Sequence, residues 1–226
     1  MVIERAARQH LSLATCTGLF VALVVPFLTY VAERAFFGAE QSSARVSSGL
    51  VLHWINLAAL VALVLWWERR PLGSIGLRMI RWWTIPAGLL AGISIMVLSG
   101  SLVSVFRLRP DTQFVSYLQS MPLLIRVLLV ITAGMFEEVL YRGYSLERLT
   151  TIWGSKWIAG IATVAVFTLA HLPAVGISHL MPIGIVSVFV TLLYLWRRDL
   201  ILNMIAHGTV DGVALLVVPI AARVAH

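Results

Sequence analysis

Long apolar runs constrain the fold of this chain more than any other feature of its sequence. A transmembrane helix needs about 20 consecutive, mostly apolar residues, and runs of this kind fill most of the 226 positions. Only 12% of the residues are charged, whereas soluble domains carry about 25%. The sequence therefore predicts an all-α fold, a polytopic transmembrane bundle of seven or eight membrane-associated helices. The expected spans are residues 11–32, 49–67, 84–106, 121–149, 156–173, 180–196 and 199–222.

One transmembrane domain is expected to cover residues 1–226, because the sequence shows no linker, internal repeat or low-complexity stretch. Within it, residues 11–120 form N-terminal spans without a motif, and residues 121–222 form the core spans that carry the polar motifs described below. The net charge of +7 comes from basic residues scattered over short loops, so no nucleic-acid binding is expected. The single cysteine, Cys16, excludes an intramolecular disulfide and a multi-cysteine metal site.

The basic residues also predict the orientation of the chain. Arg5 and Arg8 precede an apolar run that continues to about residue 32 without a small-x-small cleavage site, which indicates a retained first span. With the N-terminus inside, ten basic residues fall in inner segments and five in outer ones, in agreement with the positive-inside rule. We therefore expect a multi-pass protein of the cell inner (plasma) membrane with a cytoplasmic N-terminus. The inner set is Arg5, Arg8, Arg69, Arg70, Arg78, Arg81, Arg148, Lys156, Arg197 and Arg198, and the outer set is Arg34, Arg45, Arg107, Arg109 and Arg223.

Two carboxylates and an arginine interrupt one of the most apolar stretches of the chain, residues 134–143. An ionised side chain near the bilayer centre costs about 2.5–3.5 kcal/mol, so these groups must pair, line a wet cavity or take part in chemistry. Glu138 and Arg142 lie four residues apart on one helix face and can therefore pair with each other. Glu137 keeps no obvious partner and is the candidate general base.

Two further polar pairs have the same four-residue spacing, Phe167 with His171 and His207 with Asp211. Each pair shares one helix face. A lone histidine in an apolar helix is usually a hydrogen-bonded core residue, and a polar couple can simply hold two helices together. Each pair by itself therefore agrees with packing as well as with function.

The polar groups can meet only if the fourth helix continues past Gly143 to about residue 149. At 1.5 Å per residue, Glu137 then lies about 18 Å from the inner end of its helix and His171 about 22 Å from the start of its own. His207 and Asp211 lie about 12 and 18 Å from the start of theirs. We therefore predict one long fourth helix that brings all four groups to a similar depth.

Taken together, three short motifs resemble those of the CPBP family of intramembrane proteases. They are Glu137-Glu138-x-x-x-Arg142, Phe167-x-x-x-His171 and His207-x-x-x-Asp211, in this order and on separate spans. The family includes the CAAX prenyl endopeptidases and bacterial bacteriocin-processing, Abi-like proteins. The resemblance covers about residues 121–222, and the short chain looks like a bacterial-type member.

The resemblance implies hydrolysis of a peptide bond by a water that is activated within the membrane. The partners would be the lipid bilayer and a membrane-associated or lipidated peptide or protein. Glu137 would be the general base, and His171 would help to hold the water. The implied catalytic set is Glu137, His171, His207 and Asp211, with Glu138, Arg142 and Phe167 in support.

Asp211 departs from the family pattern, in which Asn is the commoner residue at this position. An ionised Asp211 cannot donate a hydrogen bond and would repel an oxyanion. Either Asp211 is protonated, or it orients His207 so that the imidazole becomes the donor. We favour the second hypothesis.

The sequence leaves the role of a metal open. Glu137, His171 and His207 make a His2Glu set, which is a known ligand group for catalytic zinc. In that case Glu138 or Asp211 would be the base. The same residues also support a metal-free mechanism without a cofactor, which is our expectation, with zinc as the alternative.

Functions other than peptide hydrolysis also agree with these residues. The sequence lacks a His-Glu-x-x-His zinc motif, a Gly-x-Gly-Asp aspartyl motif and a Gly-x-Ser-Gly rhomboid motif, which disfavours other intramembrane proteases. A non-catalytic immunity or scaffold protein that retains the family site is the main rival. A small proton-coupled transporter could use the same groups, but transporters usually show internal repeats.

Overall fold

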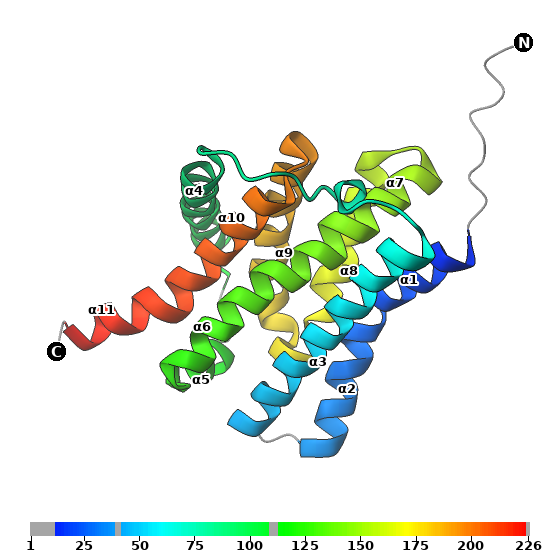
Figure 1. Cartoon of the computed structure of the whole chain (residues 1–226). Helices are drawn as coiled ribbons and strands as arrows, with labels where there is room; N and C mark the ends of the chain where they lie inside the picture. Colours follow the sequence, from blue (N-terminus) through cyan, green and yellow to red (C-terminus); the bar gives the residue numbers. More distant parts are fainter. Residues whose placement is uncertain (1–11, 39–41, 109–112, 225–226) are drawn as a thin grey trace, which may run out of the picture.

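The computed structural model describes residues 12–38, 42–108 and 113–224, and every regular element within these ranges is a helix (Figure 1). The predicted all-α fold is therefore confirmed. Arg5, Arg8 and Arg109, which entered the orientation prediction, lie outside the described residues. The α-helices in chain order are α1 (Leu13–Leu23), α2 (Val25–Phe37), α3 (Ser43–Ala62), α4 (Thr84–Val105), α5 (Gln113–Ser120), α6 (Leu123–Thr132), α7 (Glu147–Trp153), α8 (Lys156–Ala170), α9 (Leu172–Arg197), α10 (Leu200–Gly212) and α11 (Val218–Val224). Between them lie the π-helices η1 (Leu63–Trp67), η3 (Ala133–Leu146) and η4 (Val213–Val217) and the 3₁₀-helix η2 (Leu72–Ile75).

Among the described residues, four helices are long and apolar enough to cross a membrane, or five if the bent pair α1–α2 is one span. The predicted count of seven or eight is not confirmed. The helix at the predicted span 121–149 carries Arg126 as well as the charges of the first motif, and α8 has only 15 residues. The four candidate spans are Ser43–Trp67, Thr84–Val105, Val175–Arg197 and Leu200–Ala221.

The predicted first span, 11–32, is corrected to two helices. α1 and α2 meet at an angle of 43° and together reach Phe37. The break falls at Val24, and Pro26 stands in the first turn of α2. Because proline has no N–H and fixes its backbone φ angle, it is tolerated at the start of a helix but not in its interior.

The predicted boundary between spans 156–173 and 180–196 is also corrected. α8 ends at Ala170, and α9 begins two residues later, so that His171 lies at the junction of the two helices. Pro173 in the first turn of α9 has no N–H with which to continue α8. Gly176 has φ 70° and ψ 174° and kinks the start of α9, a conformation that glycine adopts without steric cost.

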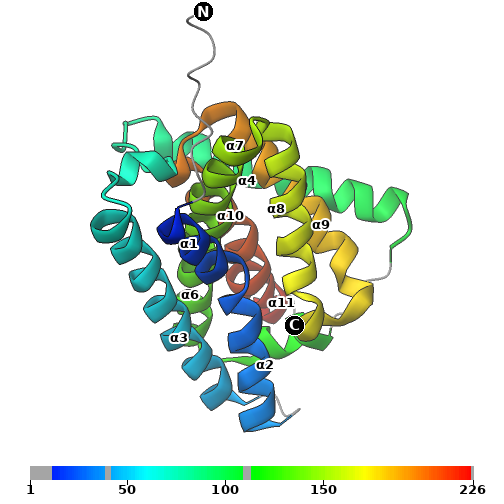
Figure 2. The same ribbon diagram turned by 90° about the vertical axis from the view of Figure 1, so that its right-hand side faces the viewer.

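α6, η3 and α7 form one continuous helix from Leu123 to Trp153, which we call the central helix. Ala133 and Glu147, at its two joins, keep right-handed helical backbone angles, and the helix ends before Gly154 at φ 69°. The predicted continuation past Gly143 is therefore confirmed. Its middle is π-helical, which the sequence did not indicate and which is frequent at functional sites. Helices α1, α3, α8 and α10 pack around it (Figure 2).

Small residues let the helices around the site approach one another closely. A Cβ atom on Gly92 would lie 2.5 Å from the carbonyl oxygen of Ala206, so α4 and α10 touch along the Gly88–Gly92 face. A Cβ on Gly134 would lie 3.4 Å from the Cα of Gly208, which brings the central helix against α10.

Glu68, just after η1, joins three helices at one end of the bundle. Its carboxylate accepts hydrogen bonds from Arg148 Nη2 at 2.6 Å, Tyr144 Oη at 2.8 Å and Thr15 Oγ1 at 3.1 Å. Burial disfavours the charged form of Glu68, but the hydrogen bonds from Arg148 and Tyr144 outweigh this effect and hold its pKa below the usual value. This ion pair ties the start of α1 and the end of η1 to the central helix.

The lowered pKa of Glu68 predicts a pH-dependent contribution to stability. A carboxyl whose folded-state pKa is depressed stabilises the fold above its unfolded-state pKa and loses this contribution as the pH falls through the folded value. We expect Glu68→Gln to lower the free energy of unfolding by about 1.5–3 kcal/mol at neutral pH. The difference in thermal unfolding temperature between wild type and Glu68→Gln should shrink in acid. A difference that stays constant from neutral to acidic pH would contradict this role.

Candidate active site

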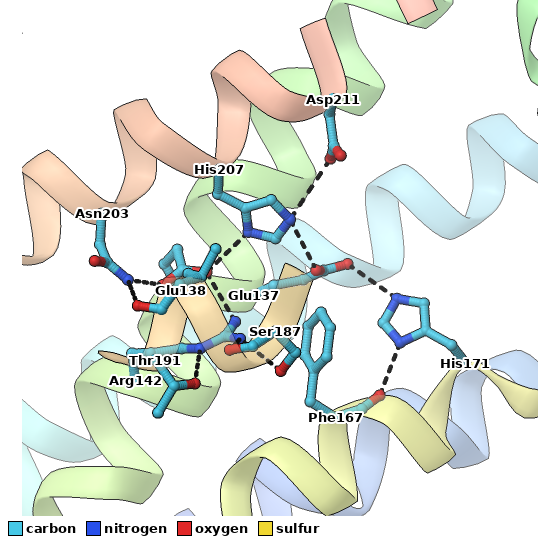
Figure 3. A network of polar contacts seen from close by, with 11 residues as sticks. Glu137, Glu138, Arg142, Phe167, His171, Ser187, Thr191, Asn203, His207 and Asp211 are labelled. Carbon is cyan, nitrogen blue, oxygen red and sulfur yellow. Dashed lines mark hydrogen bonds and ion pairs between the residues drawn. The ribbon is translucent and has the colours of Figure 1, made fainter. Parts of the chain in front are cut away.

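The candidate residues of all three motifs gather at one cavity in the middle of the bundle. Its volume is about 490 Å³, and its lining includes Glu137 from the central helix and His171 from the α8–α9 junction. His207 and Asp211 from α10 line the same cavity. Figure 3 shows these four side chains turned toward one another. The tertiary fold thus brings together residues that are up to 74 positions apart in the sequence (137 to 211).

The carboxylate of Glu137 faces both histidines. Its Oε1 lies 3.7 Å from His171 Nε2, and its Oε2 lies 3.7 Å from His207 Nε2. These distances exceed those of hydrogen bonds, so the three groups converge on a shared space rather than bonding directly. The Glu137 side chain is 19% exposed, and the two histidines are its only partners at ion-pair distance in the described part of the chain. Glu137 is therefore an accessible carboxylate of this cavity, as is Asp211, whose side chain is 31% exposed.

Hydrogen bonds on the far side of each imidazole determine which nitrogen faces Glu137. His171 Nδ1 lies 2.8 Å from the carbonyl oxygen of Phe167, and His207 Nδ1 lies 2.8 Å from Glu138 Oε1. A carbonyl and a carboxylate oxygen can only accept, so Nδ1 carries the hydrogen in both residues. In the neutral imidazole, Nε2 then presents its lone pair toward the cavity.

Glu138 is a buried hub behind the cavity. Its side chain is fully buried and accepts from Arg142 Nη1 at 2.8 Å, as the spacing predicted. It also accepts from Asn203 Nδ2 at 2.7 Å and from His207 Nδ1 at 2.8 Å. The group that orients His207 is therefore Glu138, whereas Asp211 Oδ2 lies 3.7 Å from the other nitrogen, Nε2.

Arg142 and Phe167 complete the support of the site. Arg142 donates to the hydroxyl oxygens of Ser187 at 2.9 Å and Thr191 at 3.3 Å, which fixes it to α9. Its guanidinium lies 4.6 Å from the ring centre of Phe167, which in turn lies 4.6 Å from the ring centre of His171. The ring of Phe167 thus separates the buried cation from the cavity histidine.

Several residues of the site were not predicted from the sequence. Asn203 stands four residues before His207, so extending the Asn203–His207–Asp211 spacing by one turn would have found it. His53 of α3 lines the cavity, with its ring 4.4 Å from that of Phe136, and no sequence pattern marked it. Ser187 and Thr191 lie in an apolar span without any distinguishing signal.

Whether a metal fits the site depends on how its possible ligands are arranged. Within the described ranges, no group of three or more His, Cys, Asp and Glu side chains is arranged so that it could hold a metal ion. The nitrogen and oxygen atoms of the His2Glu set that the sequence suggested lie 3.7 Å apart, which is only slightly longer than the separation of two ligands on one zinc ion, about 3.4 Å for bonds near 2.1 Å. The metal-free mechanism therefore stays a prediction.

Comparison with known proteins gives a match over part of the chain. Residues 119–213 match the family model described as type II CAAX prenyl endopeptidase, Rce1-like. This region of the chain is similar to the Rce1-like family. Comparisons with curated proteins and with solved structures gave no match.

The Rce1-like region runs from α5 to η4 and contains all three motifs. The first three predicted spans lie outside it. The match implies an intramembrane CAAX-type protease, and together with the apolar helices it supports a multi-pass membrane protein.

Proposed function

We propose that the chain is an intramembrane endopeptidase that hydrolyses a peptide bond with a water activated by Glu137. The observation that carries this proposal is the convergence of the Glu137 carboxylate with the Nε2 atoms of His171 and His207, each at 3.7 Å. A general base, a water-holding group and a group for the developing oxyanion are the parts that peptide hydrolysis needs.

In the proposed mechanism, Glu137 takes a proton from the water as the water oxygen attacks the scissile carbonyl. The Nε2 lone pair of His171 accepts the second hydrogen of that water and positions it. His207 in its doubly protonated form donates from Nε2 to the oxyanion, while Glu138 holds Nδ1. The proton on Glu137 then passes to the leaving amine, which balances the reaction.

Asp211 is proposed to assist at the Nε2 edge of His207 rather than to orient the ring. Because Glu138 already accepts from Nδ1 and Asp211 is 3.7 Å from Nε2, the charge of Asp211 is not needed to hold His207. We expect Asp211→Asn to keep activity within about tenfold of wild type, since an amide can donate to the oxyanion. Asp211→Leu should lose more. The measurement is kcat/KM on a peptide substrate. A loss of kcat/KM greater than a hundredfold in Asp211→Asn would contradict this role.

We propose a metal-free mechanism. The experiment is zinc analysis of the purified protein together with activity before and after treatment with a chelator. Activity that resists the chelator supports the proposal. Stoichiometric zinc that disappears in His171→Ala would overturn it.

The proposed substrate is a membrane-associated or lipidated peptide or protein, and the proposed location is the cell inner membrane with a cytoplasmic N-terminus. A cavity of about 490 Å³ is within the range of ligand sites. Its lining extends from the site to Tyr30 on α2 and Leu50 on α3, which leaves room for substrate residues on one side of the scissile bond.

The test of function is cleavage of a membrane-peptide library by the purified protein, with Glu137→Ala as the paired variant. Products that appear with wild type and are absent with Glu137→Ala support the proposal and report the sequence preference. Equal products from both proteins would refute Glu137-dependent cleavage. A cellular phenotype that survives Glu137→Ala would instead favour a non-catalytic immunity or scaffold role.

A further inference from the structure

A second pocket lies at one end of the bundle, away from the catalytic cavity. The segment between η2 and α4 crosses the end of the bundle at which α9 ends and α10 begins (Figures 1 and 2). The N–H of Leu200 donates to the carbonyl oxygen of Gly76 at 3.0 Å, which ties this segment to α10. Three candidate membrane spans begin or end here, at Thr84, Arg197 and Leu200. The pocket is therefore placed at a membrane boundary.

The pocket carries an excess of positive charge. Its volume is about 140 Å³, and its lining includes Arg78, Arg81 and Arg197. Among the described residues, none of these three side chains has a carboxylate within 4.0 Å. The one acidic lining residue, Asp199, is buried and accepts from the N–H of Leu202 at 3.1 Å as the N-cap of α10. Three cations thus surround a space in which the single carboxylate is already engaged.

Aromatic rings hold one of these cations in place. The guanidinium of Arg197 lies 4.9 Å from the ring centre of Trp83 and 5.1 Å from that of Trp196. Stacking of this kind restricts the guanidinium plane and leaves its N–H edges available to bind an anion. Arg197 is therefore ordered before any ligand binds.

The surroundings of the pocket are apolar and exposed. Met79 and Trp82 on the same segment are 91% and 89% exposed, and Ile80 and Trp196 are also exposed. Tryptophan is enriched at the level of the lipid headgroups, where one end of the ring is apolar and the other is wet. An anion that binds among these side chains would have to carry apolar groups beside it.

We infer that this pocket binds the phosphate headgroup of an anionic membrane lipid. The arginine side chains supply charge-assisted and bidentate hydrogen bonds to the phosphate. The exposed Met79, Ile80 and Trp82 then contact the glycerol and upper acyl region. This site is independent of the peptide chemistry at Glu137.

The test is lipid retention by the purified full chain, measured by native mass spectrometry with phosphatidylglycerol and phosphatidylcholine offered together. Wild type is expected to retain phosphatidylglycerol in preference. The double variant Arg78→Gln/Arg197→Gln is expected to lose that preference by about tenfold or more, since each arginine near an anionic lipid contributes to the attraction. Arg69→Gln/Arg107→Gln removes the same charge from two exposed arginines outside the pocket and should behave as wild type.

A single variant and a competition with inorganic phosphate test the same lipid site. Arg78→Gln alone alters an exposed residue outside any helix, so it should fold as wild type and still show a partial loss. Inorganic phosphate at the same concentration should not displace the lipid. No preference for phosphatidylglycerol in wild type, equal losses in both double variants, or displacement by inorganic phosphate would each overturn a lipid-headgroup site.

Discussion

Glu137→Gln is expected to lower kcat/KM for peptide cleavage by about 10²–10⁴-fold, the range that a general base contributes. The amide keeps the size of the side chain but cannot take a proton from water. Because His171 and His207 are each 3.7 Å away and neither is bonded directly to Glu137, the fold should hardly change. The measurement is steady-state kinetics on a cleaved peptide, with thermal unfolding in detergent beside it.

The conservative variant Glu137→Asp makes this prediction sharper. It keeps the carboxylate but draws it back by one methylene from the two histidines, so activity should fall between wild type and Glu137→Gln. Its thermal unfolding should remain close to that of wild type. Full activity in Glu137→Gln would eliminate Glu137 as the base and would leave Asp211 as the next carboxylate of the cavity to test.

Glu138→Gln is expected to reduce both stability and activity. Removing one partner from a buried ion pair typically costs about 3–5 kcal/mol, because the other charge stays buried without compensation. Arg142, with a side chain only 1% exposed, would be that charge. His207 would at the same time lose the carboxylate that accepts from its Nδ1, so the oxyanion donor would be poorly oriented. The two effects are measured by thermal unfolding and by kcat/KM.

Glu147→Gln is the matched control for Glu138→Gln. Glu147 also lies on the central helix and pairs with an arginine, Arg198, whose side chain is 60% exposed. Since solvent can compensate that arginine, the stability loss should be smaller. Activity should stay near wild type, because Glu147 has no contact with the cavity. Equal activity loss in Glu138→Gln and Glu147→Gln would mean that Glu138 acts only through stability.

The adjacent residues Glu137 and Glu138 have different proposed roles because their surroundings differ. Glu138 is enclosed by donors from the central helix and α10, and its charge is fully compensated. Glu137 projects into the cavity, where its ion-pair partners among the described residues are the two imidazoles. The same side-chain chemistry therefore supports a structural hub at one position and a reactive carboxylate at the next.

Much of this arrangement was predictable from local patterns. Apolar run lengths predicted an all-α membrane bundle, because only a helix satisfies its own backbone hydrogen bonds in lipid. The four-residue spacing predicted the Glu138–Arg142 pair, and the need to match depths predicted that the central helix continues past Gly143. Each of these follows from the geometry of a single helix, which the sequence specifies by itself.

Other features depended on contacts between helices that are distant in the chain. Glu138, not Asp211, accepts from His207 Nδ1, since packing of α10 on the central helix through Gly134 and Gly208 determines which carboxylate is within reach. The same packing places Asn203 beside Glu138. The sequence by itself determined which polar groups must be hidden from lipid, because burying a charge is costly anywhere in a bilayer. Only the tertiary structure decided which of them pair, because a hydrogen bond forms only at a donor–acceptor distance of about 2.7–3.2 Å, and the packing of separate helices sets that distance.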